Sequence, residues 1–79
     1  MRQNLKSVFD AWQRGERAAS GHASTDGVTI FSYMLPIARR GNDGNVHVLL
    51  RYPSKTTQGA INAIAAALPD AARVERIGR

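Results

Sequence analysis

Hydrophobic positions near the start of the chain recur with the period of an α-helix. Four large apolar residues follow the spacing i, i+3, i+4, i+7, namely Leu5, Val8, Phe9 and Trp12. This spacing places them on one stripe of a helix. It predicts an amphipathic helix from about Asn4 to Ala18. The polar stretch from Ser20 to Gly27 is predicted to be a loop.

The middle of the chain has the composition of β-strands. Residues from Val28 to Arg40 are rich in β-branched and aromatic types. Because proline cannot donate to a sheet ladder, Pro36 predicts an edge position, a bulge or a bend, which splits the run into Val28 to Leu35 and Ile37 to Arg40. The segment Gly41-Asn42-Asp43-Gly44 predicts a hairpin tip, since Gly and Asn tolerate positive φ. A return strand from Asn45 to Arg51 is predicted to run antiparallel. Its core-facing residues are expected to be Val46, Val48 and Leu50.

A second helix and a last strand are predicted near the C-terminus. The helical repeat consists of Ile61, Ile64, Ala65 and Leu68. It predicts a helix from about Gln58 to Leu68, with Ser54, Thr56 or Thr57 as its cap. The alternation from Arg73 to Ile77 predicts a short edge strand.

These elements predict an α+β fold in a small single domain spanning residues 1–79. The expected order is α-β-β-α-β, with a three- to four-stranded antiparallel sheet and both helices on one face. A chain of this size is near the limit at which one core suffices for stability. Oligomerisation through Trp12 or the predicted edge strand is therefore a further expectation.

Composition narrows the compartment and the partner. The chain has no cysteine and no apolar run of the roughly 18 residues that a membrane helix requires, so a soluble protein of a reducing compartment is expected. The formal net charge is +5, and residues 39–79 hold seven Lys or Arg against three Asp or Glu. A partner with negative charge, either nucleic acid or an acidic protein face, is predicted.

The basic residues of the second half are the strongest functional lead. The predicted partner-binding residues are Arg39, Arg40, Arg51, Lys55, Arg73 and Arg76, with Arg79 close behind. Arginine suits this role because its guanidinium makes bidentate contacts with phosphate or carboxylate. Three aromatic residues near them, Phe31, Tyr33 and Tyr52, either stack on bases or complete a core on the second sheet face.

Catalytic and metal-binding patterns are weak. The loop residues His22, Ser24 and Asp26 do not have the convergent arrangement expected of a nucleophilic triad. No pair among His22, Asp26, Asp43 and His47 has the spacing of a known metal motif. The Gly41–Asn45 segment holds one carboxylate, fewer than a calcium loop requires. We therefore expect neither an enzyme nor a cofactor or metal site.

One family resemblance covers residues 24–57. The motifs that carry it are Ser24-Thr25-Asp26-Gly27, Phe31-Ser32-Tyr33, Pro36-Ile37-Ala38 and Tyr52-Pro53-Ser54-Lys55-Thr56-Thr57. This pattern resembles very small proteins of phages and mobile elements. Those relatives commonly have a His shortly after the double Thr, where this chain has Gln58, Gly59 and Ala60.

The resemblance implies a phage-derived protein acting in the cytoplasm of a bacterial host. Among phage proteins of this size, non-enzymatic inhibitors of host defence complexes, anti-CRISPR proteins especially, form a natural class. The leading hypothesis is thus an inhibitor that covers an acidic surface of a host nucleoprotein complex. The alternative is a small nucleic-acid-binding module that uses the same arginines, and a homodimer is a further possibility for its assembly.

Overall fold

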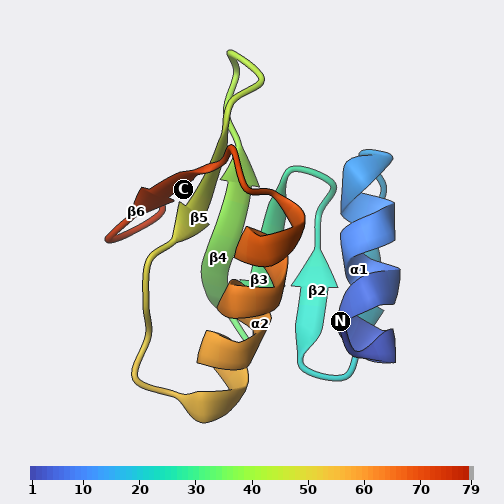
Figure 1. Cartoon of the computed structure of the whole chain (residues 1–79). Coiled ribbons are helices and arrows are strands. Elements are labelled where there is room, and N and C mark those ends of the chain that lie inside the picture. Colours follow the sequence, from blue (N-terminus) through green and yellow to red (C-terminus); the bar gives the residue numbers. More distant parts are fainter. Residues whose placement is uncertain (79) are drawn as a thin grey trace.

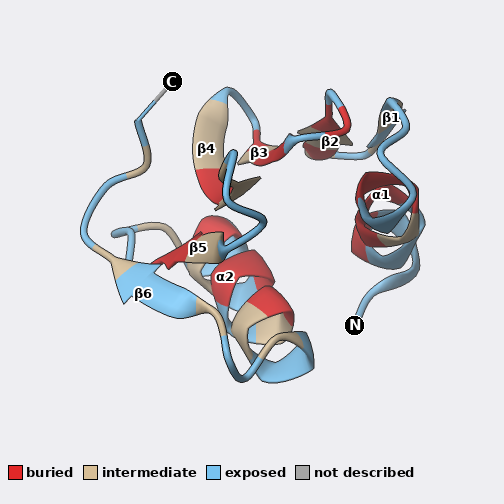
Figure 2. Ribbon diagram, turned by 90° about the horizontal axis from the view of Figure 1, so that it is seen from above, coloured by how far each residue is buried: buried red, intermediate tan, exposed pale blue. Residues whose placement is uncertain are grey.

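The computed structural model describes residues 1–78, which form two helices and six strands. In chain order these are α1 (Gln3–Gln13), β1 (Ala18–Ser20), β2 (Ala23–Thr25), β3 (Thr29–Ser32), β4 (Leu35–Arg40), β5 (Val46–Leu49), α2 (Lys55–Ala67) and β6 (Ala72–Val74). The strands form one sheet in sequence order. Both helices lie on the same side of this curved sheet (Figure 1 and Figure 2). The α+β class is confirmed, and neither helix is long and apolar enough to cross a membrane.

The predicted strand number and element order are wrong. The stretch expected to be a loop contains β2 and the end of β1, which pair as an antiparallel hairpin. Their small residues, such as Ala19 and Ser24, have weak strand propensity, so pairing with β3 and cover by α1 place them in the sheet. Because tertiary contacts stabilise β1 and β2, their local composition does not predict them.

The position of the break between the two middle strands also differs from the prediction. The chain reverses at Tyr33 and Met34, and Pro36 lies inside β4, paired with Phe31. The register shifts between Ile30 and Phe31, so Ile37 is the extra residue of a bulge. Proline is tolerated next to such an irregularity because the regular ladder is already interrupted there.

The last strand is parallel to its neighbour, which corrects the all-antiparallel prediction. β6 pairs with β5 in the parallel sense, with His47 opposite Ala72 and Leu49 opposite Val74. Because α2 connects the two strands as a crossover, the chain returns to the same end of the sheet before it enters β6. β6 is the terminal strand of the sheet, as expected for an edge strand.

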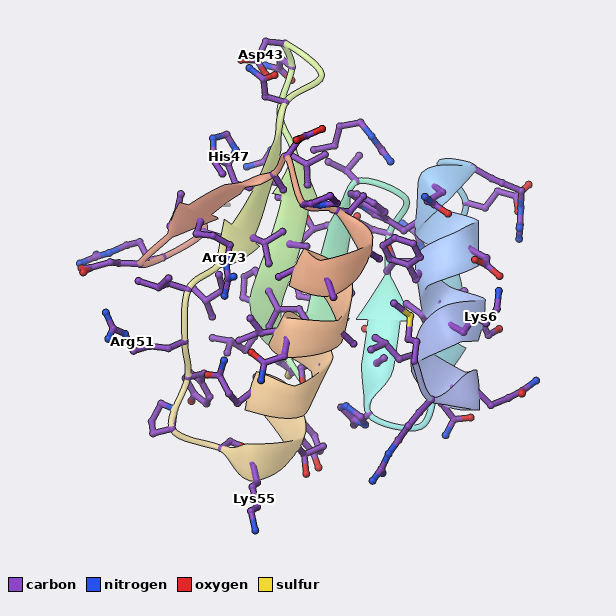
Figure 3. All side chains as sticks on the ribbon, in the orientation of Figure 1. Lys6, Asp43, His47, Arg51, Lys55 and Arg73 are labelled. Atoms are coloured by element: carbon purple, nitrogen blue, oxygen red, sulfur yellow. The ribbon has the colours of Figure 1, made fainter. Side chains whose placement is uncertain are left out.

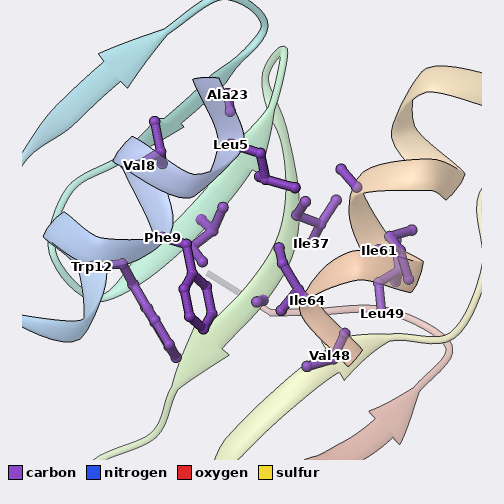
Figure 4. Packing of buried hydrophobic residues seen from close by; sticks show 13 residues of the cluster. Leu5, Val8, Phe9, Trp12, Ala23, Ile37, Val48, Leu49, Ile61 and Ile64 are labelled. Atoms are coloured by element: carbon purple, nitrogen blue, oxygen red, sulfur yellow. The ribbon is translucent and has the colours of Figure 1, made fainter. Parts of the chain in front are cut away.

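The core lies between the sheet and the two helices. All four residues of the predicted α1 stripe are buried, and the cluster also contains Ile30, Ile37, Ala38, Val48, Leu49, Ile61 and Ile64 (Figure 4). Of the predicted β5 core residues, Val48 is fully buried, whereas Val46 and Leu50 are partly buried. The α1 stripe is thus confirmed in full, whereas Ala65 and Leu68 of the predicted α2 stripe are only partly buried. Leu49, expected on the opposite face from Val48, is buried at 4% exposure.

The helix boundaries follow local chemistry. α1 ends earlier than predicted, because Gly15 adopts a φ of +72° two residues after Gln13. α2 begins earlier than predicted: Ser54 is its N-cap, and its side chain accepts a hydrogen bond from the Thr57 amide at 3.5 Å. In the first turn of α2, the Thr57 hydroxyl lies 2.9 Å from the buried Ser32 hydroxyl at the end of β3.

The Thr25-Asp26-Gly27 motif forms the turn between β2 and β3. The Thr25 hydroxyl donates to the Thr29 carbonyl at 2.7 Å and accepts from the Gly27 amide at 3.0 Å. The Asp26 carboxylate accepts from the Val28 and Thr29 amides at 2.9 and 2.8 Å. These amides, Thr29 first, hold the pKa of Asp26 below its usual value. In this chain the motif's residues thus have a structural role.

Candidate functional site

The predicted partner-binding residues occupy different environments, and the interactions of Arg40 stabilise the fold. Its guanidinium donates to the Gly27 carbonyl at 3.0 Å and to the Trp12 carbonyl at 2.9 Å. It also lies 4.4 Å from the centroid of the Trp12 ring. The Trp12 indole donates to the Val28 carbonyl at 2.7 Å. We call Trp12, Gly27, Val28 and Arg40 the Trp12 corner. The Trp12 side chain is 2% exposed, so it is not available as an oligomerisation surface.

Arg39 points to the opposite side of β4 from the core and lies under the C-terminal segment. It pairs with His47 across the β4–β5 hairpin, and its Nη1 donates to the Gly78 carbonyl at 3.1 Å. Its Nε is buried and has no hydrogen-bond partner among residues 1–78. A cleft of about 360 Å³ lies here, and its lining includes Arg39, His47 and Arg76 together with Gly41 and Asn42 of the hairpin tip. Arg39 is therefore half-covered by the chain itself.

Four predicted cations remain exposed: Arg51, Lys55, Arg73 and Arg76. Figure 3 shows Arg51 and Arg73 on the β5–β6 side of the molecule and Lys55 at the start of α2, directed away from the protein. Arg73 donates to the Leu50 carbonyl at 3.0 Å. None of the four forms an ion pair with a carboxylate of the described residues. Arg79 lies outside the described residues.

Four carboxylates already have partners elsewhere. Asp10 pairs with Lys6 at 3.0 Å, and Glu16 pairs with Arg14 at 2.8 Å. Asp26 binds the turn amides described above, and Asp43 accepts from the Asn45 amide at 3.0 Å at the hairpin tip. This backbone hydrogen bond is the main cause of a lowered pKa for Asp43. The other two carboxylates, Asp70 and Glu75, form no ion pair with a cation of the described residues, and residues 39–79 hold seven Lys or Arg against three Asp or Glu, so the second half has an excess of positive charge.

The weaker candidate chemistry does not converge. His22 precedes β2 and Asp26 follows it, so the length of the strand separates the two residues. Within residues 1–78, no three His, Asp or Glu side chains are grouped so as to hold a metal ion. Asp43 is held by the backbone of its own turn, as a hairpin requires. The structure therefore does not bring His22, Ser24 and Asp26 together as a nucleophilic triad would require.

The structure reveals a second surface that the sequence reasoning did not identify. The start of α1, the β1–β2 turn, the β3–β4 turn and the start of α2 meet at one end of the molecule (Figure 1). A hollow of about 550 Å³ lies there, and its lining includes Arg2, Leu5, His22, Lys55, Gly59 and Ala60. The Nε2 atom of His22 is buried and has no hydrogen-bond partner in the described chain.

Exposed apolar side chains lie on the β3–β4 hairpin tip and on the segment before α2, outside the lining of the hollow. Tyr33 is 64% exposed and Met34 is 81% exposed at the tip of the β3–β4 hairpin. The Tyr33 ring lies 5.5 Å from the His22 ring, and the Tyr52 amide donates to the Gln58 side chain in α2 at 2.8 Å. Tyr52 is 41% exposed, so neither tyrosine completes a core on the second sheet face. We call Arg2, His22, Tyr33, Met34, Tyr52 and Lys55 the α2-start surface.

The backbone of Tyr33 is unusual for its residue type. Its φ of +57° makes it the one non-glycine residue with positive φ in the described chain. This conformation costs a residue with a Cβ roughly 1–2 kcal/mol. Sequence reasoning missed the turn because Ser32, Tyr33, Met34 and Leu35 lack the Gly or Asn that usually marks one.

Comparison with protein-family models gives no match, and comparisons with curated proteins and with solved structures give no significant one. The functional assignment therefore depends on the geometry of this chain.

Proposed function

We propose that this protein is a non-enzymatic binding protein that docks on an acidic surface of a host defence nucleoprotein complex and blocks it sterically. The observation that carries the proposal is the set of exposed cations without a carboxylate partner in the described chain: Arg51, Lys55, Arg73 and Arg76. A surface of unmatched cations favours association with an acidic partner and accelerates encounter. The resemblance to small phage proteins supports a CRISPR-Cas effector complex as the partner.

The structure changes which arginines are suited to the contact. Arg40 binds two backbone carbonyls and the Trp12 ring, so its charge contributes to the fold. Arg39 is partly covered by the C-terminal segment. The contact is therefore best supported for Arg51 and Lys55, with Arg73 and Arg76 beside them on β6 and the segment that follows it.

The experiment is a binding titration of the purified protein against a panel of purified CRISPR-Cas effector complexes. The decisive variant is Arg51→Glu/Lys55→Glu, and Arg17→Glu is the control because Arg17 is an exposed cation outside the proposed contact. We expect the double reversal to weaken binding roughly tenfold to a hundredfold, and the control to change it less than about threefold. Thermal midpoints should stay nearly equal. If no complex of the panel binds, or if the double reversal still inhibits interference in cells, the proposal is wrong.

A second candidate function, binding of single-stranded nucleic acid, is favoured by one observation. Tyr52 is exposed beside Arg51 and near Lys55, which is the combination of ring and cations that stacks on bases and contacts phosphates. Titration with single-stranded DNA and RNA tests it. Binding whose log affinity falls with log salt by about 0.7 per phosphate, and that Tyr52→Ala weakens, would support this function. Absence of binding at low salt would exclude it.

A further inference from the structure

We propose that the hollow of the α2-start surface takes a partner segment in which a carboxylate side chain is flanked by apolar side chains. This inference rests on the proposed function, because it names the chemistry that an acidic protein partner would present. The volume, about 550 Å³, is within the range of roughly 300–1,000 Å³ found for ligand pockets. A carboxylate would complement the positive charge of the hollow, and one or two apolar neighbours would pack against its apolar walls.

Charge complementarity identifies the carboxylate. Arg2 and Lys55 both line the hollow, and no Asp or Glu is among its lining residues. The first turns of α1 and α2 contain no acidic residue, and α1 has no side chain capping its start. The two cations are therefore not neutralised locally, and an incoming carboxylate would meet positive potential alone.

His22 gives an independent sign that a polar group is missing. Its Nε2 is buried without a partner in the described chain, although its ring lines the hollow and contacts the Tyr33 ring. A buried polar atom that loses its hydrogen bond costs free energy, so such atoms are normally satisfied. Nε2 is shielded from solvent inside the protein, so a ligand oxygen would satisfy it only if the ring turned toward the hollow. The apolar walls are supplied by Leu5 and Ala60, which are both 5% exposed, with Gly59 and Ala63 beside them.

The hairpin tip beside the hollow has the composition of a protein-binding surface. Tyrosine and methionine are enriched in the cores of protein interfaces, and Tyr33 and Met34 are the two most exposed large apolar residues described. Tyr33 also holds a backbone conformation that favours glycine. An exposed aromatic residue at a strained position is a feature that folding alone does not require.

The test is an amide NMR titration with the capped tripeptide Ac-Leu-Glu-Leu-NH₂, matched against Ac-Leu-Gln-Leu-NH₂ and inorganic phosphate. We expect the Glu peptide to shift the amides of His22, Thr56 and Ala60 with millimolar affinity, and the Gln peptide to bind at least about tenfold more weakly. Equal responses to the two peptides would overturn the role of the carboxylate. Phosphate shifts as large as those of the Glu peptide would reduce the hollow to a small-anion site and overturn the proposal.

Gly59→Leu is the decisive variant because it fills the hollow and preserves the fold. A Cβ at Gly59 meets no atom within 4 Å, and replacement of a helical glycine gains up to about 1 kcal/mol. We expect Gly59→Leu to remove the peptide shifts and to keep or raise the thermal midpoint. Lys55→Gln should weaken peptide binding severalfold, and Arg17→Gln should leave it unchanged. Undiminished shifts in Gly59→Leu would place the binding elsewhere and overturn the proposal.

The two proposals fail in different ways. If the peptide binds the hollow but no defence complex binds the protein, the proposed ligand of the hollow is supported and the proposed function is wrong. If Gly59→Leu removes peptide binding yet leaves binding to a defence complex unchanged, the assignment of that contact to the hollow falls while the proposed function stands.

Discussion

The Trp12 corner and the α2-start surface use the same kinds of residue in opposite ways. In the corner, Arg40 and Trp12 stack and donate to backbone carbonyls, so an aromatic ring and a cation stabilise the fold. In the α2-start surface, Tyr33 is exposed and Lys55 has no ion-pair partner in the described chain. The residue type alone does not tell whether a cation is available to a partner. That depends on whether the folded chain brings hydrogen-bond acceptors close to it, as it does for Arg40.

The first prediction breaks the corner. Arg40→Ala removes two charge-assisted hydrogen bonds and the stacking on Trp12, and we expect a loss of roughly 3 kcal/mol in the free energy of unfolding. Arg51→Ala is the matched control and should change it by less than about 0.5 kcal/mol. Urea denaturation followed by circular dichroism measures both. Equal losses in the two variants would show that the corner contacts do not stabilise the fold.

The second prediction concerns the close approach of two turns at the Trp12 corner. Gly27 has a φ of +97°, and an added Cβ would lie 2.6 Å from the Gly15 carbonyl oxygen. Gly27→Ala should therefore cost about 2–3 kcal/mol, from backbone strain and a clash with backbone. Gly44 has a φ of +83° with no atom within 4 Å of an added Cβ, so Gly44→Ala should cost only about 1 kcal/mol. A larger loss for Gly44→Ala would contradict this packing.

The third prediction tests the buried hydroxyl pair beneath the α2-start surface. Thr57→Val leaves the Ser32 hydroxyl without its partner at 2.9 Å, and we expect a cost of about 1–2 kcal/mol. The double variant Ser32→Ala/Thr57→Val removes both hydroxyls and should be less destabilised than the sum of the single variants. Additive losses would mean that the two hydroxyls do not interact.

Periodicity predicts the helices of this fold better than its strands. The α1 stripe and the repeat of Ile61, Ile64, Ala65 and Leu68 each extend over about two turns of helix. All of the α1 stripe is buried, and Ile61 and Ile64 are core while Ala65 and Leu68 are partly buried against it. β1 and β2 are three residues each and consist of Ala, Ser and Thr, so only pairing and cover by α1 reveal them as strands. The parallel placement of β6 follows from a crossover that the expected antiparallel sheet did not include.

The candidate site is less predictable than the fold because its residues are far apart in the sequence and come together only in the folded chain. Sequence identified Arg51 and Lys55 as cations near a hairpin, but it gave equal weight to Arg40, whose acceptors come from α1 and from the turn before β3. Arg2 and His22 become relevant only because the starts of two helices and the β1–β2 turn line one hollow. No local pattern in the sequence predicts that these residues lie together.

The fourth prediction concerns the α2-start surface. A substitution there is expected to raise the free energy of unfolding, whereas substitutions at the Trp12 corner lower it. Tyr33→Gly removes the cost of a side chain at a φ of +57°, while it also removes the contact with the His22 ring. The strain, roughly 1–2 kcal/mol, exceeds an aromatic contact of about 0.5 kcal/mol, so the free energy of unfolding should rise by about 0.5–1.5 kcal/mol. Urea denaturation tests this gain, and the peptide titration should show weaker binding in the same variant. A residue whose replacement stabilises the fold but weakens binding has a functional role; a loss of stability would assign Tyr33 to the structure, as at the Trp12 corner.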